Sequence, residues 1–155
     1  MTIKKLSKMP KTNMLDVQGR YGWFYIIQLS HNATWGFGIT MNLDLRLRKG
    51  YCNPSAAKQV FSYLYYGKHS QITALERHLK NEWRDKLLCL YDDKLEWIDP
   101  KYPIDGEDIR KFIENRAKAV YPKIFRIKQD FLPFSPSKIF KNIKDEPNTY
   151  LEVIT

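Results

Sequence analysis

Two short runs of aromatic and β-branched residues most constrain how this chain can fold. The first is WFYIIQL, residues 23–29, and the second is TWGFGIT, residues 34–40, with SHN at residues 30–32 in between. Such runs favour β-strands, and a short polar break between them favours a hairpin. We therefore expect an antiparallel hairpin. Its second strand carries Gly36 and Gly38, and glycines beside large aromatic residues indicate a close approach to the backbone.

The residues after the hairpin predict one more strand and three helices. Residues 42–50, NLDLRLRKG, contain alternating leucines, but their end signals favour a short helix: an Asn N-cap, basic residues in the last turn and a terminal Gly. FSYLYYGK at 61–68 predicts a third strand. Amphipathic patterns predict helices over 71–85 and 107–118, and the residues between them, EWIDPKYPIDG at 96–106, predict a loop.

The chain of 155 residues is long enough for one self-sufficient hydrophobic core. We expect residues 1–18 to form a basic, flexible arm and residues 19–118 to form the domain. Residues 119–155, interrupted by Pro133 and Pro136, predict an irregular tail that wraps the domain or serves an interface.

The positive charge is unevenly distributed along the sequence. The formal net charge is +9, and residues 1–80 contain 12 Lys/Arg against three acidic residues, whereas residues 81–155 contain 14 of each sign. A concentrated positive field attracts polyanions, which makes DNA the first partner to consider. The alternative is a basic protein whose charge serves solubility alone.

Cysteine, histidine and hydropathy patterns favour a cytoplasmic protein. The two cysteines form no CxxC pair, and the three histidines have no zinc-ligand spacing. The basic first residues are not followed by an apolar segment of signal-peptide length, and the longest apolar run is too short to cross a bilayer. We expect no membrane association.

Four segments, taken in order, resemble a known family. GWFYIIQL, WGFGIT, NLDLRLRKG and ITALERHLKNEW are similar to the GIY-YIG nuclease domain, in particular to its divergent branch found in phage proteins. In that branch the second motif reads roughly Tyr-Lys-Ile-Gly-x-Thr, and a later helix carries Ala-Leu-Glu. The match covers about residues 21–118. It implies an α+β fold, a small three-stranded antiparallel sheet flanked by helices, here followed by a C-terminal helix and the irregular tail.

The resemblance also implies an activity and its residues. Members cleave a DNA phosphodiester with one divalent metal ion, Mg²⁺ or Mn²⁺. The tyrosine of the first motif falls on Tyr25, the arginine of the following helix on Arg46 and the metal-binding glutamate on Glu76, while Gly38 and Thr40 match the second motif. The residue types suit this chemistry, because a guanidinium pairs with phosphate oxygens and one carboxylate with water can hold a hard divalent ion.

Further basic residues are candidates for contacts with the DNA backbone: Arg48, Lys49 and Lys68. The sequence contains no zinc finger and no helix-turn-helix after residue 118. We therefore expect low sequence specificity, or specificity supplied by a partner protein or a homodimer. A phage-encoded protein of this kind would act in the host cytoplasm.

The sequence departs from the family pattern at two positions. Gly36 stands where the family usually has the second-motif tyrosine, and Gly50 stands where it often has a histidine. These differences favour an alternative function, a catalytically impaired GIY-YIG-like module that binds nucleic acid or a protein as a regulator. A third interpretation is a basic adaptor protein without a nuclease fold.

Each candidate residue also has a structural interpretation. Tyr25 is typical of a strand aromatic packed in the core, Glu76 has the spacing of a helix ion pair with Lys80, and Arg46 is typical of a solvated helix face. His78 points away from Glu76 on the same helix and is expected at the surface. Convergence of Tyr25, Arg46 and Glu76 on one cleft would distinguish the nuclease fold from the adaptor.

Overall fold

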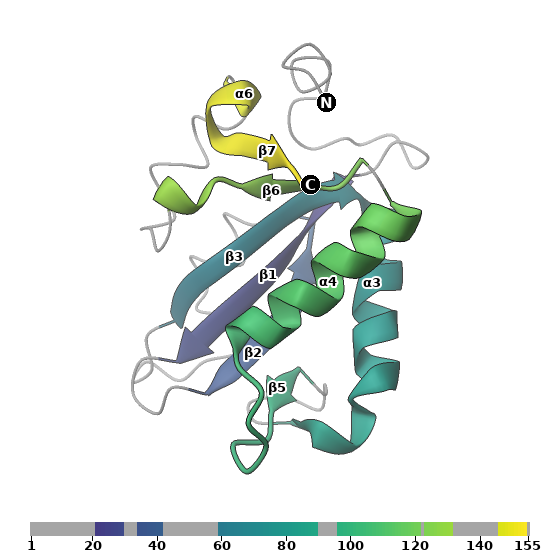
Figure 1. Cartoon of the computed structure of the whole chain (residues 1–155), viewed down its shortest axis with the longest axis vertical. Helices are drawn as coiled ribbons and strands as arrows, with labels where there is room; N and C mark the ends of the chain where they lie inside the picture. Colours follow the sequence, from purple (N-terminus) through teal and green to yellow (C-terminus); the bar gives the residue numbers. More distant parts are fainter. Residues whose placement is uncertain are drawn as a thin grey trace.

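The predicted hairpin forms the centre of an α+β fold (Figure 1). The computed structural model describes residues 21–29, 34–41, 59–89, 96–121, 123–131 and 146–154. Strand β1 (Tyr21–Leu29) pairs antiparallel with β2 (Trp35–Thr40) on one side and with β3 (Gln59–Lys68) on the other. All three strands expected from the sequence are therefore confirmed. The arm at 1–18 and the helix expected over 42–50 lie outside the described residues.

The expected three-stranded sheet is wrong, because the described strands form a seven-stranded antiparallel sheet in the order β4-β5-β2-β1-β3-β6-β7. The four additional strands are β4 (Leu87–Leu88), β5 (Trp97–Ile98), β6 (Phe125–Ile127) and β7 (Leu151–Val153). The loop expected over 96–106 thus contains a strand, and the expected irregular tail contributes two. Strands of two or three residues are too short to show a period-two pattern, so the sequence does not reveal them.

Two long helices lie side by side against one face of the sheet, α3 (His69–Glu82) and α4 (Gly106–Val120) (Figure 1). Both confirm predicted helices with shifted ends. The start of α4 is fixed by a capping box, in which the Asp105 side chain accepts from the Asp108 N–H and the Asp108 side chain accepts from the Asp105 N–H, each at 3.0 Å. The remaining helical pieces are short: η1 (Arg84–Lys86), η2 (Gln129–Phe131) and α6 (Pro147–Tyr150).

Residues of β1 alternate between two hydrophobic clusters, one on each face of the sheet. Phe24 and Ile26 join the cluster beneath α3 and α4, which we call the helix face. Trp23, Tyr25 and Ile27 join a second cluster on the opposite face, which includes residues of the short strands β5, β6 and β7. Because both faces of β1 are buried, its sequence is a nearly continuous apolar run rather than an alternating one.

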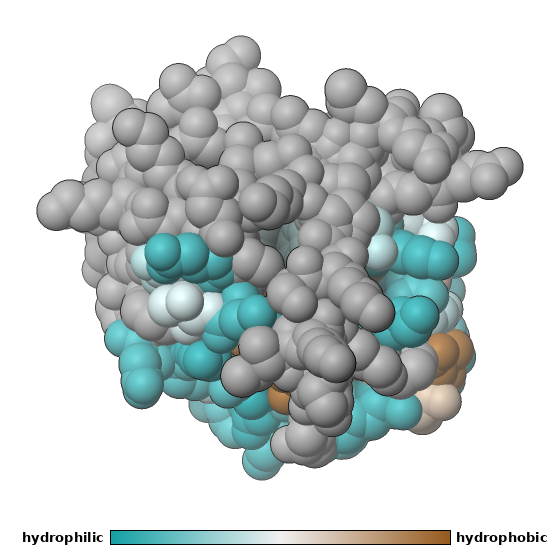
Figure 2. Space-filling model, turned by 90° about the horizontal axis from the view of Figure 1, so that it is seen from above, coloured by the Kyte–Doolittle hydropathy of each residue, from teal (hydrophilic) through white to brown (hydrophobic). Residues whose placement is uncertain are grey.

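The surface of the described residues is largely polar. Seen from above, hydrophilic residues dominate the coloured part of the molecule (Figure 2). Among the described residues, the large apolar side chains that are exposed are Met41 and Val120. None of the helices in the described ranges combines the length and the apolar character needed to cross a bilayer.

Leu151→Ala tests whether β7 is part of the core. Leu151 is 1% exposed and belongs to the opposite-face cluster, so its truncation is expected to lower the free energy of unfolding by about 2–5 kcal/mol. Val120→Ala is the control, since Val120 is 43% exposed, and it should change stability by about 0.5 kcal/mol or less. Urea unfolding measures both. Equal small losses would contradict a core role for the C-terminal strand.

Candidate functional site

The Tyr25 side chain lies over Gly38 of the neighbouring strand. The two residues are direct partners in the β1–β2 pairing. A Cβ atom at position 38 would lie 2.6 Å from Tyr25 Cζ and closer still to Oη, so a side chain other than hydrogen leaves no room for the ring. The same relation holds between Gly36 and Trp97, where a Cβ would lie 2.7 Å from the indole Cζ3. The close approach expected at the glycine pair is confirmed, and the approaching groups are two aromatic rings.

Tyr25 is a core residue in this structure. Its side chain is 1% exposed and packs on the opposite face with Ile27, Leu64 and Trp97. The structural interpretation of Tyr25 as a packed strand aromatic is therefore confirmed. Its hydroxyl nevertheless marks the point where the first and second motifs of the sequence meet, because Gly38 belongs to the second motif.

Glu76 belongs to a polar stripe along α3, formed by His69, Thr73, Glu76 and Lys80. Their spacing of four, three and four residues places them on one side of the helix. Both ends of the stripe, at His69 and at Lys80, lie near residues of β1 or beside β2. A Cβ at Gly22 would lie 3.1 Å from His69 Nδ1 and 3.4 Å from the Thr40 carbonyl oxygen, and the Lys80 ammonium reaches Glu96, which precedes β5 beside β2.

The predicted site residues are placed only in part. Arg46, Arg48 and Lys49 lie outside the described residues. Lys68 is exposed at the end of β3, immediately before α3. Tyr25 packs on the opposite face, whereas Glu76 lies on α3, which covers the helix face. The sheet therefore separates the two side chains, and the expected convergence of Tyr25 and Glu76 on one cleft is not found.

The surroundings of Glu76 suit a cation. Its Oε1 lies 3.5 Å from Lys80 Nζ, so the ion pair predicted from spacing is confirmed. The same ammonium lies 4.0 Å from Glu96 Oε1, and the Glu96 side chain is only 6% exposed. Two carboxylates around one positive charge are a donor set that Mg²⁺ or Mn²⁺ can use together with water. Within the described ranges, no group of three or more His, Cys, Asp or Glu side chains could hold a metal ion.

Sequence reasoning missed Glu96. Glu96 is the first residue of the loop expected over 96–106, although a charged residue directly before two apolar residues is a usable signal. The contact between Glu96 and Lys80 depends on β5 pairing with β2, and a two-residue strand carries no pattern that predicts this pairing.

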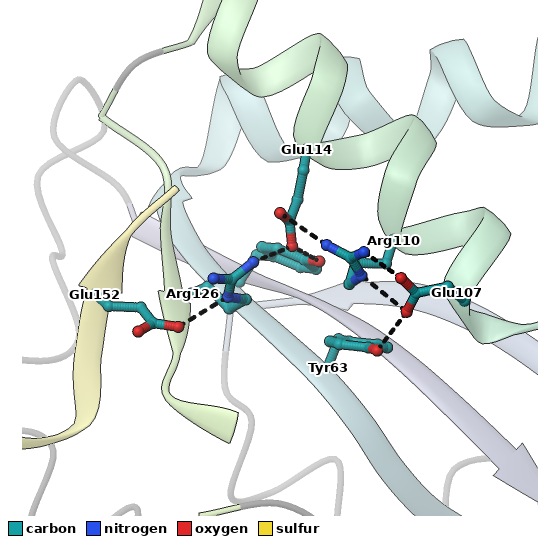
Figure 3. A network of polar contacts seen from close by, with 7 residues as sticks. Tyr63, Glu107, Arg110, Glu114, Arg126 and Glu152 are labelled. Carbon is teal, nitrogen blue, oxygen red and sulfur yellow. Dashed lines mark hydrogen bonds and ion pairs between the residues drawn. The ribbon is translucent and has the colours of Figure 1, made fainter. Parts of the chain in front are cut away.

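A second polar cluster joins α4 to the C-terminal strands (Figure 3). We call it the α4–β6 network: Tyr63, Tyr65, Glu107, Arg110, Glu114, Arg126 and Glu152. Arg110 donates to Glu107 and Glu114, and Arg126 donates to Glu114 and to Glu152. Because both guanidinium groups are committed to carboxylates, the network favours a structural role over phosphate binding.

The protonation states in the network fit that structural role. The pKa of Tyr65 is raised well above its usual value by burial and by the charge and hydrogen bond of Glu114. The pKa of Tyr63 is raised by burial and by its hydrogen bond to Glu107. Hydrogen bonds from Arg110 and Tyr63 lower the pKa of Glu107 to about 2. Both phenols therefore stay protonated as donors, and neither suits the role of a general base.

His78 is not a simple surface residue, so the expectation from helix geometry is wrong. It is half-buried, and its Nε2 lies 2.8 Å from Arg116 Nη2 on α4. Because a guanidinium only donates, His78 Nε2 is the acceptor of this bond. The contact joins α3 to α4.

Comparisons of the chain with protein-family models, curated proteins and solved structures find no match. The geometry of β1, β2 and α3 and the resemblance of the sequence motifs are therefore the observations that bear on function.

Gly38→Ala tests the contact between the two motifs. The new methyl group would overlap the buried Tyr25 ring, and we expect a loss of about 1–3 kcal/mol in the free energy of unfolding. Tyr25→Phe in the Gly38→Ala background should recover part of the loss, because Oη is the nearest atom. Gly22→Ala is a milder control, with its nearest contact at 3.1 Å. Thermal and urea unfolding measure the four proteins, and an unchanged Gly38→Ala variant would contradict the close contact.

The shifted pKa values of residues in the α4–β6 network predict a loss of stability at both extremes of pH. Glu107 has a lowered folded pKa of about 2, so its contribution is present at neutral pH and is lost as the pH falls from about 4.3 towards 2. Tyr63 and Tyr65 have raised folded pKa values, so their contribution is present below pH 10 and is lost as the pH rises above it.

Urea unfolding across this pH range checks both limbs. Glu107→Gln should flatten the acid limb relative to the wild type, and Tyr63→Phe should flatten the alkaline limb. Glu82→Gln, on an exposed residue of α3, should alter neither limb. Parallel profiles for Glu107→Gln and the wild type would show that the network does not link pH to stability.

Proposed function

We propose that the chain is a metal-dependent DNA endonuclease of GIY-YIG type, which hydrolyses phosphodiester bonds with low or partner-supplied sequence specificity. The observation that carries the proposal is the Tyr25 hydroxyl over Gly38, because it joins the functional tyrosine of the first motif to the glycine of the second. The order of elements also supports it: two strands that carry these motifs, a third strand, and then the helix with Glu76.

The proposed roles follow from the chemistry of each side chain. Tyr25 activates the attacking water or accepts its proton, and Arg46 binds the non-bridging phosphate oxygens with paired donors. An unperturbed tyrosine pKa is about 10, so Tyr25 needs positive charge beside it to act as a base at neutral pH. Glu76 holds Mg²⁺ or Mn²⁺, which when bound supplies Lewis-acid stabilisation of charge on the phosphate.

Binding of DNA would depend mainly on charge. The excess of Lys and Arg lies in residues 1–80, and the described part of this region presents Lys68 at the surface beside the start of α3. Arg48 and Lys49 are the other proposed backbone contacts. Contacts of this kind position the duplex without reading its sequence, which supports low intrinsic specificity.

A second candidate function is a GIY-YIG-like module that binds nucleic acid or a protein without cleaving. Three observations favour it. Tyr25 and Glu76 lie on opposite sides of the sheet. Tyr25 is 1% exposed, and Gly36, in the position of the usual second tyrosine, packs against Trp97 rather than presenting a phenol. Under this alternative the buried Tyr25 ring maintains the β1–β2 contact, and binding does not require its hydroxyl.

The deciding experiment is cleavage of supercoiled and linear DNA by the full chain with Mg²⁺ or Mn²⁺. Tyr25→Phe, Arg46→Ala and Glu76→Gln should each reduce the cleavage rate by about 100-fold or more, since each removes a group acting in the transition state. EDTA should abolish cleavage. Glu82→Gln is the matched control, because Glu82 is an exposed glutamate on the same helix.

A binding measurement on the same proteins separates the two candidate functions. DNA bound by the wild type without cleavage under either metal would support the non-catalytic module. Cleavage that persists in Glu76→Gln and Tyr25→Phe would overturn the assigned site. Absence of both cleavage and DNA binding would overturn the proposal and leave the adaptor interpretation.

A further inference from the structure

Lys80 holds a position between two carboxylates from different elements. Its Nζ lies 3.5 Å from Glu76 Oε1 and 4.0 Å from Glu96 Oε1. The carboxylate side chains are 13% and 6% exposed, respectively, whereas the Lys80 side chain is 27% exposed. The lysine side chain is therefore the most exposed of the three, and both glutamate side chains are largely buried.

The backbone of each glutamate is held in place, that of Glu96 by the sheet and that of Glu76 by helix α3. The Phe37 N–H donates to the Glu96 carbonyl oxygen at 3.0 Å, and the next residue, Trp97, pairs with Gly36 of β2. Glu76 follows directly after the buried Leu75 of α3. Two carboxylates are thus held near one point by the sheet and by the helix.

Such an arrangement attracts a cation. Two carboxylates that share a site repel one another, and carboxylates with little exposure are costly unless they are paired. Lys80 supplies one positive charge on a flexible stem that reaches solvent. A hard divalent cation supplies two charges and prefers oxygen ligands. Lys80 Nζ therefore lies within 4.0 Å of both carboxylates, in the region where a cation between them would be held.

We infer that Glu96 is a second carboxylate ligand of the divalent cation proposed at Glu76, and that Lys80 is a built-in competitor for the same position. The inference rests on the proposed nuclease function for the presence of the metal. It adds Glu96, a residue outside the matched motifs, to the proposed metal site. It also gives Lys80 a role in setting metal affinity: metal binding requires the Lys80 ammonium to leave, so metal affinity is lower than the two carboxylates alone would provide.

Direct titration with Mn²⁺ tests the inference without reference to cleavage. The metal-free full chain is titrated at neutral pH, and free Mn²⁺ is measured by electron paramagnetic resonance. Glu96→Gln should weaken binding about tenfold or more, because it removes a charged oxygen ligand. Lys80→Met should tighten binding about tenfold, because it removes a positive charge about 4 Å from the carboxylates. The double variant should bind more weakly than Lys80→Met alone.

Two exposed residues provide matched controls, Glu82→Gln on α3 and Lys118→Met on α4, and both should retain wild-type affinity. Circular dichroism without metal checks folding. If Lys80→Met is unfolded because its carboxylates repel one another, folding restored by Mn²⁺ or by the added Glu96→Gln change would support the inference.

The outcomes separate this inference from the proposed function. Mn²⁺ binding that is lost in Glu76→Gln but unchanged in Glu96→Gln and Lys80→Met would overturn the second ligand and leave the proposed metal at Glu76. Absence of Mn²⁺ binding in the wild type and in Lys80→Met would overturn both. Weaker binding in Glu96→Gln together with tighter binding in Lys80→Met would support both.

Discussion

The burial of β1 on both faces is the constraint on which the rest of the structure depends. Phe24 and Ile26 need the helices as a cover, and Tyr25 and Ile27 need a second cover on the other face. One three-stranded sheet with two helices would satisfy only the first requirement. The short strands β5, β6 and β7 contribute Trp97, Phe125, Ile127 and Leu151 to the second cluster, so hydrophobic burial explains why the sheet extends beyond the predicted core.

The same constraint determined what could be predicted from the sequence. Strands β1, β2 and β3 and helices α3 and α4 have patterns long enough to be recognised, and their order was expected. The short strands carry no such pattern and exist because they pair with neighbours distant in sequence. Polar contacts between distant residues could not be predicted for the same reason. The i,i+4 pair of Glu76 and Lys80 was predictable, whereas the contacts of Lys80 with Glu96 and of Tyr65 with Glu114 depend on tertiary packing.

The residue types of the candidate site could be predicted from the sequence better than their arrangement and burial. Gly38 was expected to allow a close approach, and the approaching group is the predicted Tyr25. Burial of Tyr25 was one of two interpretations, because an aromatic residue in a strand is equally compatible with a core and with a site. The glycine pair therefore serves packing directly, and the catalytic role that we propose for Tyr25 depends on access of substrate to the hydroxyl over Gly38.

The two polar clusters of the helix face differ in a way that bears on function. In the α4–β6 network, arginines and carboxylates interleave, so that Arg110 and Arg126 each lie between two glutamates and Glu114 lies between the two arginines. A network satisfied in this way fixes the position of α4 and of the C-terminal strands. At the end of the polar stripe of α3, Glu76 and Glu96 share Lys80 at longer distances, and that lysine is the most exposed of the three. A bidentate guanidinium is difficult to displace, whereas a single ammonium at 3.5 to 4.0 Å can be exchanged for another cation. The interleaved ion pairs thus lie along α4, and the exchange of Lys80 for a metal ion that we propose lies along α3, beside the strand that carries Gly38.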